Sequence, residues 1–182
     1  MKIIPLLFAL SVVAVPGVAL AETSFVHGAG ALATFEHISD DGCVHTVGEI
    51  VLVQATRGGD LADGLYITGS QEDVCTGAGN GFASFTEGNF LVFPLVVARA
   101  TRTVVAPSYS SGADITFEIN LTWFGRGAIS PTLDHFRDEG GASVSYNASR
   151  GAATIGFVKA DGVVMPITSA RLIHQASGSI SY

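Results

Sequence analysis

Two histidines and two aspartates lie close together in the sequence and could bind a metal ion. His37, Asp40, Asp41 and His45 fall within nine residues. Imidazole nitrogens and a carboxylate are ligands that zinc and copper accept. If the chain on either side folds as a hairpin, the strand register decides whether the two imidazoles share a face. The alternative is a plain turn at Asp40-Asp41-Gly42, because Asp side chains accept hydrogen bonds from nearby backbone N–H groups.

A second polar cluster lies in the segment Ala128–Gly141. Asp134, His135, Asp138 and Glu139 could supply the acid and the base of a glycoside hydrolase. The segment also contains a proline, and its pattern is the least strand-like in the chain. We therefore predict a surface loop, which among short turns would be a candidate binding feature. A solvated, charged loop without a catalytic role is the alternative.

Phe124 is a candidate ligand contact because it falls on the polar face of a predicted strand, Asp114–Phe124. Five apolar side chains alternate with polar ones along this strand, which is the pattern of a strand buried on one face. The apolar residues are Ile115, Phe117, Ile119, Leu121 and Trp123. Phe124 lies on the opposite face, where an aromatic ring could stack on a sugar. Single apolar residues are also common on surfaces without any function.

Common catalytic and nucleotide-binding motifs are absent from the sequence. No Gly-x-Ser-x-Gly run marks a nucleophile elbow. No Lys-Ser or Lys-Thr pair follows the two Gly-Ala-Gly runs, as a phosphate-binding loop would require. The formal net charge of −7 argues against nucleic acid as a partner. The sequence favours a non-enzymatic protein without a cofactor over an enzyme.

The N-terminus has the three parts of a cleaved signal peptide. Lys2 precedes an apolar run of 13 residues, Ile3–Val15, and Ala19-Leu20-Ala21 fits the small-x-small cleavage pattern. The apolar run is too short to span a bilayer comfortably, and no cysteine follows the cleavage position to carry a lipid. We expect removal of residues 1–21 and a secreted or periplasmic location, with no membrane insertion after cleavage.

Cys43 and Cys75 are the two cysteines of the chain. An even number of cysteines in an exported protein favours a disulfide. Such a bridge would stabilise the fold by roughly 3–4 kcal/mol in the chain-entropy model, for a loop of about 33 residues. Two free thiols or a metal pair are the alternatives, and the lack of a Cys-x-x-Cys unit argues against metal.

The mature chain has the composition of a single β domain. Removing 21 of the 182 residues leaves 161, which fits one domain at residues 22–182. Thr, Val, Ile and Phe recur between glycine-rich turns, and no stretch of 12 residues shows helical spacing. Asp161-Gly162 predicts a two-residue hairpin turn.

We predict an all-β fold, namely a single antiparallel β-sandwich of about eight to ten strands, with a small β-barrel as the alternative. Val51 and Val53 are expected in its core together with the apolar face of 114–124.

Three short patterns occur in the order Asp41-Gly42-Cys43, Val74-Cys75-Thr76-Gly77 and Leu121-Thr122-Trp123-Phe124-Gly125-Arg126-Gly127. Their order resembles a group of uncharacterised exported bacterial proteins that are predicted to be β-rich. The resemblance covers most of the mature chain in outline. It implies a secreted β domain with a bridging cysteine pair, and it transfers no functional residue.

The sequence therefore predicts an exported, non-enzymatic binding or structural module, with a cell-surface or glycan-binding role as the narrower version. Its partner would be a glycan or a protein. A secreted hydrolase that uses the polar loop around His135 is one competing hypothesis. A periplasmic metal-binding protein that uses His37 and His45 is the other.

Overall fold

The computed structural model describes residues 22–57, 63–109 and 114–181, and the regular structure in these ranges is β-strand. Within them, the structure has no helix that could span a membrane. The predicted signal peptide, residues 1–21, lies outside the described residues. The strands are β1 (Glu22–Ile38), β2 (Val44–Arg57), β3 (Gly64–Asp73), β4 (Ala78–Glu87), β5 (Leu91–Phe93), β6 (Val97–Pro107), β7 (Asp114–Asp138), β8 (Gly141–Ala160), β9 (Val163–Val164) and β10 (Ile167–Ser181).

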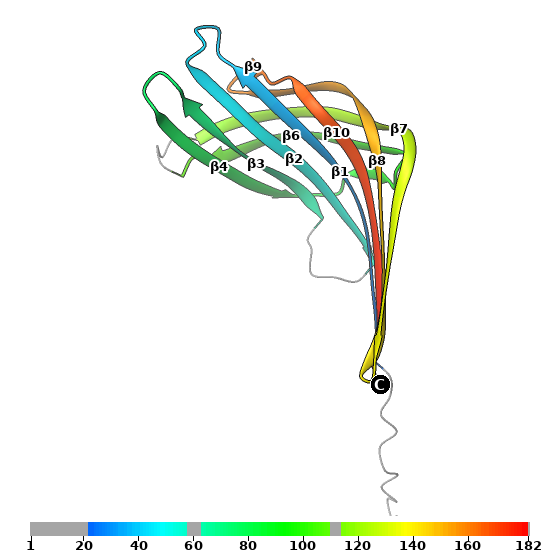
Figure 1. The fold of residues 1–182 in the computed structure, drawn as a ribbon. Coiled ribbons are helices and arrows are strands. Elements are labelled where there is room, and N and C mark those ends of the chain that lie inside the picture. The colour runs from blue at the N-terminus through cyan, green and yellow to red at the C-terminus, as the bar shows by residue number, and fades with distance from the viewer. Residues whose placement is uncertain (1–21, 58–62, 110–113, 182) are drawn as a thin grey trace, which may run out of the picture.

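The ten strands form one antiparallel sheet in the order β4-β3-β2-β1-β10-β8-β7-β6-β5, with β9 paired to β8. Strands that follow each other in the sequence are neighbours within β1–β4 and within β5–β8, an arrangement typical of antiparallel sheets. β10 inserts between β1 and β8, so the first and last strands lie side by side (Figure 1). The predicted all-β, antiparallel fold is confirmed.

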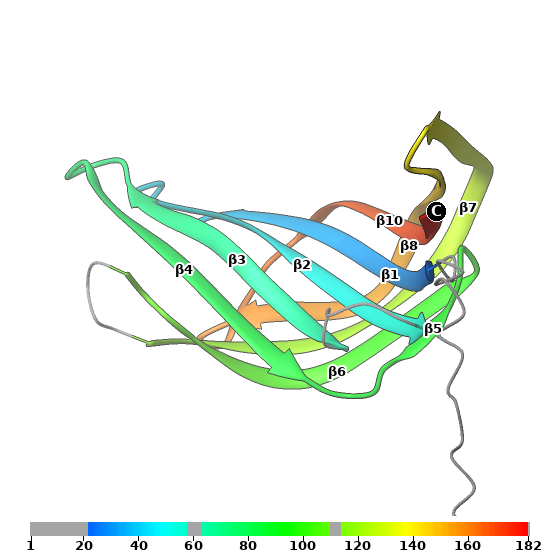
Figure 2. The same ribbon diagram turned by 90° about the horizontal axis from the view of Figure 1, so that it is seen from below.

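The sheet curls until its two ends approach each other, as the view from below shows (Figure 2). β4 and β6 meet at an isolated bridge between Phe82 and Ser108. Beside it, the Ser84 hydroxyl donates a hydrogen bond of 2.8 Å to the Val105 carbonyl. No ladder joins these two strands in the described ranges, so the sheet stays open and does not close into the small barrel considered as an alternative.

The core lies between the two halves of the curved sheet, as in a sandwich. Phe35 and Phe82 come from the β1–β4 half and Phe117 comes from β7, and all three are fully buried. The Phe117 ring centroid lies 6.0 Å from that of Phe35 and 5.1 Å from that of Phe82. Aromatic rings at these separations and tilts contribute beyond the area that they bury. The three rings therefore fix how the two halves face each other.

Two glycines make room for this aromatic core. Gly48 and Gly69 lie in one row across the sheet, with Phe35 and Phe82 as their outer neighbours. A Cβ atom at Gly48 would lie 2.5 Å from the Phe35 ring, and one at Gly69 would lie 2.5 Å from the Phe82 ring. The phenyl rings therefore cover the backbone of these glycines, and a larger residue would displace them.

The strand predicted from its alternation, 114–124, is the first part of β7. Its apolar side chains face the core, and Phe124 lies on the other face with 42% of its surface exposed. Both features were predicted from the period-2 pattern. The buried residues are Phe117, Ile119, Leu121 and Trp123, with Ile115 packed against them.

The core prediction for β2 is wrong by one residue. Val51 and Val53 are partly exposed on the outer face, whereas Ile50 and Leu52 are fully buried. The register explains the difference, because Ile50 pairs directly with buried Ala33 of β1. Residues paired across an antiparallel ladder share a face, so β1 decides which side of β2 enters the core.

β7 and β8 continue past the body of the sheet and form an arm (Figure 1). Residues 131–138 and 141–148 pair there beside the end of β10 and the start of β1. The prediction of a surface loop at Ala128–Gly141 is therefore wrong, because the chain is strand to Asp138 and turns at residues 139–140. β6 pairs with β7 only as far as Phe124, so Pro131 lies on an edge strand, where proline is tolerated.

The predicted hairpin turn at Asp161-Gly162 is confirmed. It joins β8 to β9, and its two residues have positive φ angles of 48° and 84°. Positive φ at both central residues is the requirement of a type I′ turn, which matches the twist of the flanking strands.

The predicted disulfide between Cys43 and Cys75 is present, with Cα atoms 5.2 Å apart. It joins the turn between β1 and β2 to the turn between β3 and β4. The Cys43 backbone N–H donates to Asp41 at 3.0 Å, and the Cys75 N–H donates to Asp73 at 2.9 Å. Each cysteine is thus held in a turn that an aspartate closes, which sets the two sulfur atoms facing each other.

Candidate functional site

The two histidines predicted as metal ligands lie on opposite faces of the β1–β2 hairpin. His37 pairs with Thr46, and His45 pairs with Ile38. Because successive residues alternate faces, this register separates the two imidazoles. His45 Nε2 lies 2.8 Å from Glu36 Oε1, its neighbour on the outer face. The structure does not bring His37 and His45 together.

Asp40 and Asp41 lie in the turn between these strands. Asp41 accepts hydrogen bonds from the Ser39 hydroxyl and from the Cys43 N–H, and Gly42 has a φ of 74°. This is the turn chemistry expected for Asp-Asp-Gly. In the part of the chain that the structure describes, no group of three or more His, Cys, Asp or Glu side chains could hold a metal ion.

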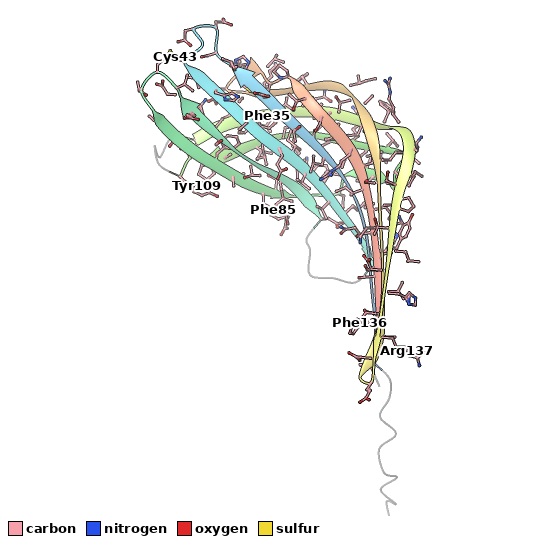
Figure 3. The ribbon with its side chains drawn as sticks, viewed as in Figure 1. Phe35, Cys43, Phe85, Tyr109, Phe136 and Arg137 are labelled. Atoms are coloured by element: carbon pink, nitrogen blue, oxygen red, sulfur yellow. A yellow bond between two sulfur atoms is a disulfide. The ribbon has the colours of Figure 1, made fainter. Side chains whose placement is uncertain are left out.

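The cluster of Asp134, His135, Asp138 and Glu139 lies at the far end of the arm, beside the labelled Phe136 and Arg137 (Figure 3). All four residues are exposed. Asp134 and His135 project to opposite faces because they are consecutive in a strand. Asp138 accepts a hydrogen bond of 2.8 Å from the Gly140 N–H and so closes the turn. The strand therefore spreads these side chains apart and does not gather them around a cleft.

Phe124 belongs to a row of apolar residues across the outer face of β5–β8. The register places it opposite Val97 of β6 and Ala153 of β8, and Val97 is opposite Phe93 of β5. Phe93 is 55% exposed. The two phenyl rings thus stand in one row with only a small aliphatic side chain between them, and neither is covered by another layer.

The next row along the strands carries two further exposed apolar side chains. Leu91 is paired with Arg99, Arg99 with Thr122, and Thr122 with Ile155. Leu91 is 50% exposed and Ile155 is 67% exposed. Rows on one face are about 7 Å apart, so these side chains adjoin those of the first row. We call the surface formed by both rows the Phe124 face; it comprises Leu91, Phe93, Val97, Arg99, Thr122, Phe124, Ala153 and Ile155.

A polar groove continues directly from the Phe124 face. This groove lies on the outer face of β6–β8, and the residues that line it there include Thr101, Thr103, Glu118, Asn120 and Phe157. Asn120 pairs with both Thr101 and Phe157, one row beyond Thr122. The groove thus offers hydroxyl, amide and carboxylate groups next to exposed aromatic and aliphatic side chains.

Lys159 contacts two of the residues that line this groove, Phe157 and Glu118. Lys159 Nζ lies 4.7 Å from the centre of the Phe157 ring and donates a hydrogen bond of 3.4 Å to Glu118 Oε2. A cation over a ring face and beside a carboxylate is attracted by both. These contacts hold the Glu118 carboxylate at the edge of the groove, where it can accept hydrogen bonds.

A second apolar surface lies on the outer face of β2–β4. The Tyr66 and Phe85 rings stack with centroids 4.4 Å apart, and Val51 and Val53 lie in the same shallow groove. Figure 3 labels Phe85 on β4. Because the two rings cover each other, this surface exposes less aromatic area than the Phe124 face, where the rings stand apart.

Comparisons with protein-family models, with curated proteins and with solved structures find no match to this chain.

The sequence reasoning found Phe124 but missed its neighbours. Leu91 and Phe93 lie in a continuous apolar run, Phe90–Ala98, whose pattern does not distinguish an exposed face, and Ile155 lies in a segment without regular alternation. Pro94 within this run favours an edge position or a bulge. An edge position leaves backbone groups unpaired, so it does not indicate which side chains are exposed. The pairing of strands β5 to β8 determines which of these side chains become neighbours. This pairing cannot be predicted from the residues of a single strand.

Proposed function

We propose that this protein is an exported, non-enzymatic glycan-binding module, and that the glycan docks on the Phe124 face. The observation that carries the proposal is the set of exposed side chains at Phe93, Phe124 and Ile155, each between 42% and 67% exposed on an uncovered sheet face. Exposed apolar residues that adjoin each other, unlike scattered ones, mark interaction surfaces.

The Phe124 face combines aromatic rings with polar side chains, and this combination favours a sugar over a purely apolar ligand. A pyranose ring has a C–H face, which packs on aromatic rings, and hydroxyl groups around its edge. Phe93 and Phe124 supply the rings, and Arg99 and Thr122 supply polar contacts in the adjacent row. Binding surfaces of this kind combine an apolar platform with a few polar groups that set orientation.

The chemistry of the face supports binding and not cleavage. Glycoside hydrolysis uses two carboxyl groups on either side of the scissile bond. The residues that form the Phe124 face and the adjoining groove include one carboxylate, Glu118, and its side chain is paired with Lys159. Among the described residues that form this surface, a second carboxyl group for such a pair is not present.

Export rests on the signal-peptide pattern of residues 1–21 and on the disulfide. A disulfide fits an oxidising compartment, such as the periplasm or the exterior of the cell. Polysaccharides of the envelope and of the surroundings are present there.

The test is a glycan array probed with the mature protein and with two variants. Phe124→Thr removes one ring from the face, and Phe136→Thr removes an exposed ring from the arm as a matched control. We expect array signal for the mature protein and for the control, with binding at least about 10-fold weaker for Phe124→Thr, a loss of about 1.4 kcal/mol. No signal on the array, or equal signal from Phe124→Thr, would overturn the proposal. Binding of apolar peptides at the same face would assign it to a protein partner.

A further inference from the structure

Two histidines far apart in the sequence meet on neighbouring strands. His27 lies on β1 and His174 lies on β10, and their Nε2 atoms are 2.6 Å apart. The ring centroids are 4.6 Å apart, and the rings are nearly perpendicular. The two Nε2 atoms thus face each other at hydrogen-bond distance.

The register of β1 and β10 produces this convergence. His27 pairs with Ala176 and His174 pairs with Ala29, so the histidines are diagonal neighbours on one face. Diagonal neighbours on paired strands lie within reach of long or aromatic side chains. On the β1–β10 ladder, the residue opposite each histidine is an alanine, which leaves space for both rings to turn towards each other. On the other side of β1, His27 pairs with Arg57 of β2.

Tyr146 of β8 holds one of the two rings. Its ring packs edge-on against His174 with centroids 5.8 Å apart. Ala148, paired with His174 across the β10–β8 ladder, is buried. His174 is therefore oriented by packing on the β8 side while its Nε2 faces β1, an arrangement that pre-positions the nitrogen.

The surroundings of His174 disfavour its charged form. Burial lowers the pKa of His174, and the neighbouring His27 lowers it further because two imidazolium charges repel. A neutral imidazole has a lone pair available for a metal ion, whereas an imidazolium has none.

We propose that His27 and His174 bind a divalent transition-metal ion of the copper or zinc class through their two Nε2 atoms. Bonds of about 2.0–2.1 Å at angles near 90–110° would set the two nitrogens about 2.9–3.4 Å apart. A small rotation of the rings provides this separation. Water would complete the coordination, and Cu²⁺ would bind more tightly than Zn²⁺ by the usual order for nitrogen ligands.

The site lies where the arm joins the body of the sheet. An ion there would tie the first strand to the last strand, because His27 and His174 come from β1 and β10. It is distinct from the His37 and His45 pair considered in the sequence, whose imidazoles lie on opposite faces. The His27–His174 site is also distinct from the Phe124 face. A negative result for one proposal therefore does not affect the other.

The chain has five histidines, which makes a matched experiment possible. Isothermal titration of the tag-free mature protein with CuCl2, and separately with ZnCl2, measures stoichiometry and affinity. We expect one ion per chain, and at least about 10-fold weaker binding for His27→Gln and for His174→Gln. The controls are His37→Gln, His45→Gln and His135→Gln, which should bind as the parent does.

A measurement on the unmodified protein makes the test independent of variant folding. Titration with ZnCl2, followed through the imidazole ¹⁵N resonances, should shift Nε2 of His27 and His174 and leave the other three histidines in place. Absence of binding at about 100 μM metal, or loss of binding in His37→Gln, His45→Gln or His135→Gln, would overturn the proposal.

Discussion

Trp123 Nε1 donates a hydrogen bond of 3.1 Å to the carbonyl oxygen of Leu32, across the core from β7 to β1. The Trp123 side chain is fully buried, so its N–H has no access to water. This contact connects the two halves of the curved sheet through a buried hydrogen bond, and its removal should be measurable.

Replacing Trp123 tests that connection. Trp123→Phe keeps a ring but removes the N–H donor, and we expect a loss of about 1–3 kcal/mol in the free energy of unfolding. Trp123→Ala also leaves a cavity and should cost about 3–5 kcal/mol. Urea denaturation of the three proteins gives both values. Equal stabilities of the parent and Trp123→Phe would show that the hydrogen bond contributes nothing.

Gly48 and Gly69 should tolerate no side chain, because Phe35 and Phe82 cover them. We expect Gly48→Ala to lower the free energy of unfolding by about 1–3 kcal/mol through overpacking. Gly79→Ala is the control, since a Cβ atom there would be 4.0 Å from its nearest neighbour, the Gln71 carbonyl. Thermal unfolding compares the variants, and a Gly48→Ala protein as stable as Gly79→Ala would contradict the aromatic packing.

The disulfide should contribute a large share of the stability. We expect the double variant Cys43→Ser, Cys75→Ser to lose roughly 3 kcal/mol, because the bridge limits the unfolded chain. Thiol titration of the denatured, unreduced parent protein should find no free thiol. Two thiols per chain in that titration would mean that the bridge does not form.

The turns beside the disulfide should respond to acid. Hydrogen bonds from the Ser39 hydroxyl and the Cys43 N–H lower the pKa of Asp41 below 3.8, and those from Thr76 and the Cys75 N–H do the same for Asp73. A lowered folded-state pKa means that the stabilisation is present above about 3.9 and is lost as the pH falls through the folded-state value.

The measurement is an NMR titration of the Cys43 and Cys75 amide resonances. Both should keep their shifts from neutral pH down to about 4 and then move, with midpoints below 3.8. Asp41→Asn should abolish the transition at Cys43 and leave the one at Cys75. A midpoint above 3.8 at either amide would show that the aspartate is not held as a carboxylate.

Local patterns predicted much of this fold. The alternation from Ile115 to Trp123 placed a strand and its buried face correctly, and it set Phe124 on the other side. Asp161-Gly162 specified a turn by itself, because few residue pairs accept two positive φ angles. The cysteine pair followed from the even count in an exported chain.

Features set by pairing between distant strands could not be predicted. Ile50 to Val53 are all apolar, so only the pairing of Ile50 with Ala33 reveals which of them face the core. Residues 131–138 lack a clean alternation because the arm has no second layer over either face, and their charges and proline indicated a loop. His27 and His174 are 147 residues apart and meet only because β10 inserts beside β1.

The Phe124 face is the central claim, and mapping the bound glycan on the protein tests it most directly. The strongest ligand from the array is titrated into ¹⁵N-labelled mature protein, and amide shifts are followed by NMR. The account predicts that the largest shifts fall on β5–β8 at Phe93, Phe124 and Ile155, with little change at Tyr66 and Phe85. Largest shifts at Tyr66 and Phe85, or shifts confined to the arm, would contradict it.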